Sequence, residues 1–392
     1  MPTSRLNLAV LALCQALAMT SMTMVMTTIA LIGVEIAPVS GLATLPLALQ
    51  LAVTMATAIP ASLFMRRFGR RVGFSLGAAV GVVSAAVSAY AIYLGSFALF
   101  SVSAAAYGVT QSFAGFYRFA AVETAPRERR AEAASLVLAG GVVAGLVGPT
   151  LAVLSRTLVE GSLFSGTFLA IAALSALALA VIQALRIPPS PEAERGAGTA
   201  TVGALLARPL FLLAVASASI GYASMSLLMT ATPLAMAEHR HSFPATAFVI
   251  QWHVVGMYAP SFVTGLLIGR WGVLTVILVG AATILGAVAI DQSGTSLAQF
   301  WTALVLLGIG WNFMYVGGTT LLAEAHGPAE RAKAQALNEF VMFAFITAAS
   351  LGSGLLQQTV GWVWVNLAVV PGLLAIAAAT LWLRPRGRAA AA

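Results

Sequence analysis

The sequence is poor in charge. Only 8% of its 392 residues are Asp, Glu, Lys or Arg, whereas a soluble domain carries about 25%. Apolar residues make up 60% of the chain, and the mean hydropathy is +0.96. This composition excludes a cytosolic enzyme, a nucleic-acid-binding protein and a secreted domain. It predicts an all-α integral membrane protein whose main surroundings are the lipid bilayer.

Cysteine is nearly absent, since Cys14 is the only one and lies in an apolar run. A single cysteine excludes an internal disulfide and a thiolate metal cluster. The sequence also lacks a Gly-rich phosphate loop ending in Lys-Ser or Lys-Thr, and it places no Ser/His/Asp set or carboxylate pair at bilayer depth. We therefore expect a protein that is not an enzyme, is not driven by ATP and holds no prosthetic group.

Long apolar runs dominate what is present. A bilayer core about 30 Å thick takes about 20 helical residues per crossing, so the apolar content allows about twelve crossings. Charged residues, glycine and proline divide the chain accordingly. The twelve expected spans cover about 6–34, 41–65, 72–94, 96–123, 134–155, 163–185, 209–236, 244–268, 272–291, 296–323, 333–357 and 360–384.

A polar linker at 186–208 separates the sixth expected span from the seventh, and it contains a Pro-Pro-Ser-Pro stretch. It divides the expected organisation into an N-terminal six-helix half at 1–185 and a C-terminal six-helix half at 209–392. Two equal halves are typical of transporters that are built from an internal repeat.

The positions of the basic residues predict the orientation. If both termini are cytoplasmic, all but two of the 20 Lys and Arg residues fall on inner loops and tails. Only Arg156 and Arg240 fall on the outer side. The positive-inside rule therefore favours cytoplasmic termini, and we expect a multi-pass protein of a bacterial inner membrane.

Two short loops recur with nearly the same offset. Arg67, after the second span, corresponds to Arg270, after the eighth, 203 residues further on. The loop that begins at Pro126 corresponds to the loop that begins at Pro328, 202 residues further on. Because two unrelated loops give almost the same offset, the sequence predicts two similar halves.

The loop after the second span resembles the signature of the major facilitator superfamily, GxxxDRxGRR. Residues 67–71, Arg-Phe-Gly-Arg-Arg, match its second part, while Ser62 and Arg66 replace the leading Gly and the Asp. This resemblance implies the major facilitator fold, with twelve transmembrane helices in two six-helix halves and alternating access. It also implies an inner gate formed by Arg67, Gly69, Arg70, Arg71 and Arg270.

Soft side chains at bilayer depth are the candidate functional residues, because polar groups there usually line a pathway. The seventh span contains Met225 and Met229, and the eighth contains His253 and Met257. Residues four apart project from one face of a helix. The two pairs also fall at nearly the same depth, so three thioethers and one imidazole can converge.

This set of ligands is soft and uncharged. Thioether and imidazole suit Cu(I), whereas Mg, Ca and Mn prefer carboxylates and carbonyls. Neutral ligands also hold a permeating ion less firmly than thiolates, as transport requires. The pattern therefore indicates copper as a transported substrate. Methionine is also a common filler of apolar helices, and a single intramembrane histidine can instead bind a backbone carbonyl or an organic solute.

The same pairs resemble the mark of one branch of the superfamily, the CcoA-like transporters of cytochrome c oxidase assembly. That branch carries Met-x-x-x-Met on helix 7 and His-x-x-x-Met on helix 8. The resemblance implies import of copper for cytochrome oxidase assembly, with transit ligands Met225, Met229, His253 and Met257. Relatives without the metal pairs are associated with flavin uptake, and no protein partner can be named.

Two other functions stay open. One is an organic-solute transporter for a flavin or a drug-like molecule, in which Trp252 and His253 contact the substrate. A comparison of copper uptake with riboflavin uptake separates it from copper import. The more distant one is a membrane sensor or assembly factor that binds metal without moving it, which transport in reconstituted vesicles would exclude.

Overall fold

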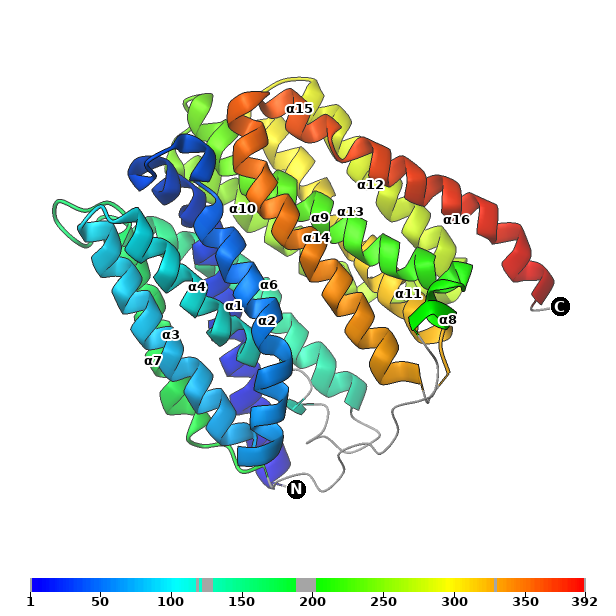
Figure 1. The fold of residues 1–392 in the computed structure, drawn as a ribbon, viewed down its shortest axis with the longest axis horizontal. Helices are drawn as coiled ribbons and strands as arrows, with labels where there is room; N and C mark the ends of the chain where they lie inside the picture. Colours follow the sequence, from blue (N-terminus) through cyan, green and yellow to red (C-terminus); the bar gives the residue numbers. More distant parts are fainter. Residues whose placement is uncertain (1, 118–119, 122–129, 188–201, 328–329, 391–392) are drawn as a thin grey trace. The chain divides into compact units, whose positions relative to one another are not determined.

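The computed structural model describes residues 2–117, 120–121, 130–187, 202–327 and 330–390. Within these ranges the chain is built from helices joined by short turns and contains no β-strand (Figure 1). Nine of the described helical segments are long and apolar enough to cross a membrane. The prediction of an all-helical membrane protein is therefore confirmed.

Met1–Ala193 and Arg240–Val255 form one compact unit. In this unit α1 packs against α6 and α7, α2 packs against α4, and α3 packs against α4 and α7. Its helices are α1 (Pro2–Ile36), α2 (Leu45–Phe68), α3 (Arg70–Tyr93), α4 (Phe97–Ala114), α6 (Arg130–Ser155) and α7 (Ser165–Ile182), with a short 3-10 helix at Ser40–Leu42.

Glu194–His239 and Gly256–Ala392 form the second unit. In this unit α9 packs against α13, α14 and α16, and α12 packs against α13 and α16. Its helices are α8 (Val202–Leu206), α9 (Pro209–Glu238), α11 (Ser261–Trp271), α12 (Val273–Gln292), α13 (Leu297–Glu324), α14 (Arg331–Thr359), α15 (Trp362–Leu367) and α16 (Val370–Ala390). The remaining helix, α10 (Phe243–Tyr258), begins in the first unit and ends in the second.

The two units repeat one packing pattern. The contacts of α1 with α6 and α7 correspond to those of α9 with α14 and α16. The contacts of α3 with α4 and α7 correspond to those of α12 with α13 and α16. Corresponding helices follow the same order along the chain, so the structure supports the internal repeat that the loops indicate.

The turns at the recurring loops have the same geometry. Gly69 has φ 87° and ψ 157°, and Gly272 has φ 82° and ψ 151°. The Gly69 N–H donates to Met65 O at 2.9 Å, and the Gly272 N–H donates to Ile268 O at 2.8 Å. Each glycine thus ends one helix and begins the next. A positive φ strains any residue that carries a Cβ, which explains glycine at both turns.

Replacing Gly69 or Gly272 by alanine is expected to destabilise the protein by about 1 kcal/mol each. A Cβ would meet no atom within 4 Å at either position, so the cost comes from the backbone alone. Thermal unfolding of the purified protein in detergent measures the change. Gly265→Ala is the matched control, because its Cβ also has open space but its backbone is helical. An equal loss for Gly265→Ala would contradict this explanation.

Two expected spans are divided in the structure. The expected helix at 244–268 ends as α10 at Tyr258 and resumes as α11 at Ser261. Pro260 lies in the interruption and has no N–H to continue the helical hydrogen bonds. The expected span at 360–384 is likewise divided into α15 and α16.

Parts of the remaining expectations lie outside the described residues. The fourth span was expected at 96–123, but α4 ends at Ala114, and 122–129 are not described. Of the expected linker at 186–208, residues 188–201 are not described, while 186–187 and the final residues, which include α8, are. The division into two halves at this linker stays a prediction.

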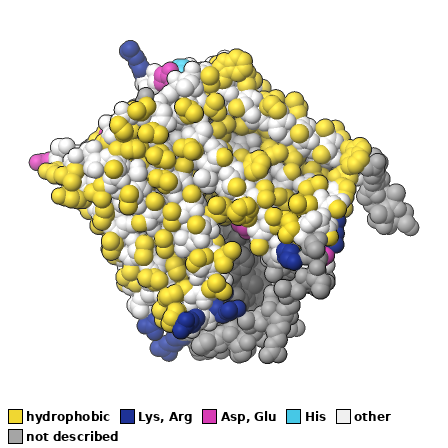
Figure 2. Space-filling model, in the orientation of Figure 1, with side chains coloured by type: hydrophobic (Ala, Val, Ile, Leu, Met, Phe, Trp, Pro, Cys, Tyr) yellow, Lys and Arg dark blue, Asp and Glu magenta, His cyan; other side chains and the backbone are white. Residues whose placement is uncertain are grey.

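The surface of α2 and α3 is apolar along most of its length. Figure 2 shows hydrophobic side chains covering this side of the first unit and basic side chains gathered at one end of it. The exposed basic residues of the turn between α2 and α3 are Arg66, Arg67 and Arg71. An apolar flank with a basic end is typical of a membrane protein at its cytoplasmic surface. The orientation itself stays a prediction.

Candidate functional site

The four predicted copper ligands are all buried. Met225 and Met229 lie on α9, and Met257 lies on α10, with exposures of 4%, 5% and 5%. His253, one turn before Met257, is 0% exposed. The three methionines belong to the second unit and the histidine to the first, because the units divide within α10. The burial of all four residues is compatible with a site in the interior of the protein. Their convergence on one ion stays a prediction.

Asn312 of α13 spans the interruption between α10 and α11. Its Nδ2 donates to Met257 O at 2.7 Å and to Ser261 Oγ at 2.7 Å. Thr264 Oγ1 donates to Asn312 Oδ1 at 2.7 Å. Asn312 is 1% exposed. Since Pro260 breaks the helical pattern here, the asparagine supplies hydrogen bonds that the helix cannot make and fixes the geometry of the break.

Four aromatic side chains gather beside this break. Trp311 stacks on Tyr315, one turn later on α13, with ring centroids 5.1 Å apart and planes inclined by 6°. Tyr222 of α9 and Tyr258 of α10 both contact Trp311 edge to face. Their ring centroids lie 5.2 Å and 6.1 Å from that of Trp311. Tyr222 also contacts Tyr315 at 5.7 Å. We call these four residues the aromatic cluster, and all of them belong to the second unit.

The three tyrosines of the aromatic cluster are partly accessible. Trp311 is 4% exposed, whereas Tyr222, Tyr258 and Tyr315 are each only half-buried. Aromatic faces are apolar and polarisable, and binding sites for small molecules are commonly lined by them. The cluster therefore offers ring faces on which a planar solute can stack.

The organic-substrate contacts predicted from the sequence do not share one environment. Trp252 is 37% exposed, and its ring centroid lies 6.4 Å from that of Phe248. His253 is fully buried. Consecutive helical residues point about 100° apart, which explains the difference. Neither residue belongs to the aromatic cluster.

The predicted gate residues lie on both units, so an interaction between the two sets stays a prediction. Arg270 is exposed at the end of α11. Arg71 Nη2 donates to Gln183 Oε1 at 3.2 Å and thereby connects α3 with the end of α7. Two further cations of the loop lie over aromatic rings, Arg67 over Phe68 at 5.3 Å and Arg70 over Phe116 at 5.9 Å.

A bidentate ion pair connects the start of α9 with the loop between α13 and α14. Arg208 Nη1 and Nη2 donate to Glu330 Oε2 and Oε1 at 2.7 and 2.8 Å. The Gly327 N–H donates to Glu330 Oε2 at 3.0 Å, and Arg208 Nη1 also donates to Ala325 O at 3.2 Å. The hydrogen bonds from Arg208, followed by the one from Gly327, lower the pKa of Glu330 to about 2.

Acid is expected to weaken this connection. Because the folded-state pKa of Glu330 lies below its ordinary value of 4.5, the ionised carboxylate stabilises the folded state above about pH 4.5, and that contribution is lost as the pH falls toward about 2. Thermal unfolding at pH 3 and pH 7 measures the effect. Glu330→Gln should lose less stability between these two pH values than the parent, while Glu324→Gln, at an exposed site, should behave like the parent. An unchanged acid response in Glu330→Gln would contradict the assignment.

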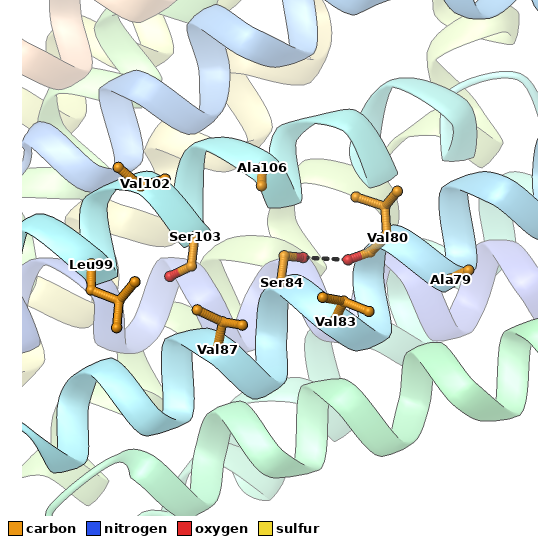
Figure 3. A pocket seen from close by; sticks show the side chains of 9 residues that line it. All are labelled: Ala79, Val80, Val83, Ser84, Val87, Leu99, Val102, Ser103 and Ala106. Carbon is orange, nitrogen blue, oxygen red and sulfur yellow. Dashed lines mark hydrogen bonds between the residues drawn. The ribbon is translucent and has the colours of Figure 1, made fainter.

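A cavity of about 410 Å³ lies between α3 and α4 (Figure 3). Its two hydroxyl groups are already engaged, since Ser84 Oγ donates to Val80 O at 2.7 Å and Ser103 Oγ lies 2.7 Å from Ser88 Oγ. Such a cavity suits a hydrocarbon chain better than a polar solute, and we assign it no transport role. Its lining is Ala79, Val80, Val83, Ser84, Val87, Leu99, Val102, Ser103 and Ala106.

The repeated helical units and the apolar spans define a multi-pass membrane protein built from two related parts. The sequence profile of the Major Facilitator Superfamily matches residues 11–229 and 215–392. The chain belongs to this superfamily and is a membrane transporter rather than an enzyme.

Three curated relatives are similar to this chain. The riboflavin transporter RfnT of Brucella anthropi is 39% identical over 393 residues, which cover 99% of this chain and 98% of the relative. Two uncharacterized MFS-type transporters of Bacillus subtilis also match. YddS is 30% identical over 263 residues, which cover 62% of this chain and 60% of YddS. YdeG is 33% identical over 166 residues, which cover 42% of this chain and 38% of YdeG. Because the relative with a named substrate is a riboflavin transporter, the comparisons favour the organic-solute alternative over copper import and give no support to the CcoA-like branch.

Proposed function

We propose that this protein is a secondary transporter that carries a flavin-like organic solute, with riboflavin as the leading substrate, across a bacterial inner membrane. The aromatic cluster is the structural observation that carries this proposal. Riboflavin contains a planar tricyclic ring system with polar atoms along its edge. Half-buried tyrosines around a buried tryptophan provide aromatic rings on which such a ring system can stack.

The riboflavin transporter of Brucella anthropi supports the proposal because its similarity extends over 99% of this chain. Similarity within a superfamily does not by itself transfer a substrate, since one fold serves many cargoes. The proposal therefore rests on the relative and the aromatic cluster together. Cytoplasmic termini and import as the direction of transport are parts of the same proposal.

Copper import is the weaker hypothesis. Its structural support is the burial of Met225, Met229 and Met257 in one unit, but burial is also what ordinary packing of methionine in apolar helices produces. No relative reported above is named for copper or for oxidase assembly. A soluble copper chaperone or an oxidase subunit is accordingly not proposed as a partner.

Growth of a bacterium that can neither synthesise nor import riboflavin tests the proposal. Expression of this protein should restore growth at low micromolar riboflavin, and added copper should not replace the vitamin. Cells that carry the empty vector control for passive entry. Absence of rescue, with the protein present in the membrane fraction, would count against riboflavin as substrate.

A further inference from the structure

Trp311 carries a buried polar group that stacking does not use. The indole Nε1–H is shielded from solvent and has no hydrogen-bond partner among the described residues. Most buried N–H groups in folded proteins are paired, because an unpaired one loses its bonds to water without replacement. An acceptor supplied by a bound ligand would remove that cost.

The neighbouring hydrogen-bonding group is already engaged. The side chain of Asn312, the next residue, donates to Met257 O and Ser261 Oγ and accepts from Thr264 Oγ1. Turning the amide toward the indole would break these hydrogen bonds. The rings that contact Trp311 belong to three tyrosines, and each of them is partly accessible. A ligand that packs against the accessible parts of these tyrosines would lie next to Trp311.

The orientation of the rings favours a contact at the edge of the ligand. The ring planes of Tyr222 and Tyr258 are inclined to the indole by 88° and 74°. A flat solute stacked on either tyrosine would stand steeply to the indole plane, an orientation in which an edge of the solute can point toward Trp311. In a flavin, that edge includes the carbonyl oxygens of the pyrimidine ring, which are hydrogen-bond acceptors.

The donor is held on a closely packed helix. A Cβ added at Gly310, the residue before Trp311, would lie 2.8 Å from Gly280 O of α12. α13 therefore approaches the backbone of α12 directly at this level. A donor fixed in this way loses little freedom when it binds a ligand, which favours selectivity.

We infer that Trp311 recognises the transported solute by donating its indole N–H to an edge carbonyl of a planar heteroaromatic ring. The inference rests on the proposed function. It adds the residue that determines specificity, Trp311, and the kind of hydrogen-bond acceptor that this residue selects. A planar solute without such an acceptor would stack on the tyrosines but leave the indole unpaired.

Trp311→Phe tests the inference because it keeps an aromatic ring and removes the donor. Quenching of riboflavin fluorescence on binding to the purified full-length protein in detergent gives Kd. We expect Kd to rise roughly tenfold, as for the loss of one buried hydrogen bond. The thermal midpoint should fall only by the amount expected for replacing an indole with the smaller phenyl ring, since the N–H has no partner to lose among the described residues.

Trp362→Phe is the matched control. Its indole Nε1 is also buried without a partner among the described residues, and its ring packs on Phe300 at 5.5 Å, outside the aromatic cluster. This variant should keep the parent Kd. A second measurement avoids variants altogether: in NMR spectra of the parent with labelled tryptophan, riboflavin should move one indole N–H proton downfield, as a new hydrogen bond does.

The outcomes are distinguishable. If the parent neither binds nor transports riboflavin, the proposed function fails and the inference fails with it. If the parent binds riboflavin but Trp311→Phe keeps the same Kd and no indole proton moves, the inference alone is overturned. Equal weakening in Trp311→Phe and Trp362→Phe would also overturn it, because the effect would then not be local to the aromatic cluster.

Discussion

Replacing Tyr222 and Tyr315 together by alanine is expected to raise the Kd for riboflavin by about a hundredfold or more. Stacking of a planar heteroaromatic ring on an aromatic side chain contributes about 1–3 kcal/mol per ring, and about 1.4 kcal/mol corresponds to tenfold in Kd. Both tyrosines contact Trp311 and each other, so the double substitution also removes support for the Trp311 ring. Fluorescence quenching and uptake into cells both measure the loss.

The control for this experiment uses tyrosines outside the aromatic cluster. Tyr90 and Tyr93 lie on α3 and are each 59% exposed. Their joint replacement by alanine removes the same number of rings and hydroxyl groups, and riboflavin binding should stay at the parent level. A change of less than about threefold in the Tyr222 and Tyr315 double variant would show that the aromatic cluster is ordinary packing.

Asn312→Leu is expected to destabilise the protein by about 3 kcal/mol, the largest single-site effect on stability that we predict. The substitution removes the donor to Met257 O and to Ser261 Oγ and the acceptor of Thr264 Oγ1. These groups lie at a helix break where the backbone has few alternative partners. Equilibrium unfolding in mixed micelles, or the shift in thermal midpoint, measures the change.

Gln292→Leu provides the comparison for Asn312→Leu. Gln292 Nε2 donates to Val363 O at 3.0 Å at an exposed position, so water can replace the lost hydrogen bond. Its loss should cost about 0.5 kcal/mol or less. Similar stability losses for the two variants would contradict the conclusion that the hydrogen bonds of Asn312 stabilise the interruption between α10 and α11.

The fold could be predicted largely from the sequence because its signals are local. Apolar runs of about 20 residues separated by charge and by turns are the direct consequence of the bilayer's thickness. The break at 259–260 was missed, although Pro260 is visible in the sequence. Membrane helices often tolerate proline when a neighbouring helix supplies the lost hydrogen bonds, and the sequence does not show that Asn312 does so here.

The candidate site could be predicted only in part. Met225 with Met229, and His253 with Met257, are visible as pairs four apart because both members lie on one helix. The aromatic cluster has only one such pair, Trp311 with Tyr315. Tyr222 and Tyr258 come from other helices, and their contacts with Trp311 exist only once α9, α10 and α13 have packed. Methionine pairs four residues apart also arise from ordinary packing of apolar helices, so this pattern alone does not distinguish a copper site from packing.

Uptake into proteoliposomes that contain the purified protein, with riboflavin and Cu(I) supplied separately, tests the central claim most directly. We predict saturable accumulation of riboflavin that the Tyr222 and Tyr315 double variant loses and Met225→Ala retains. The opposite pattern would contradict the account: copper accumulation without riboflavin uptake, abolished by Met225→Ala or His253→Ala.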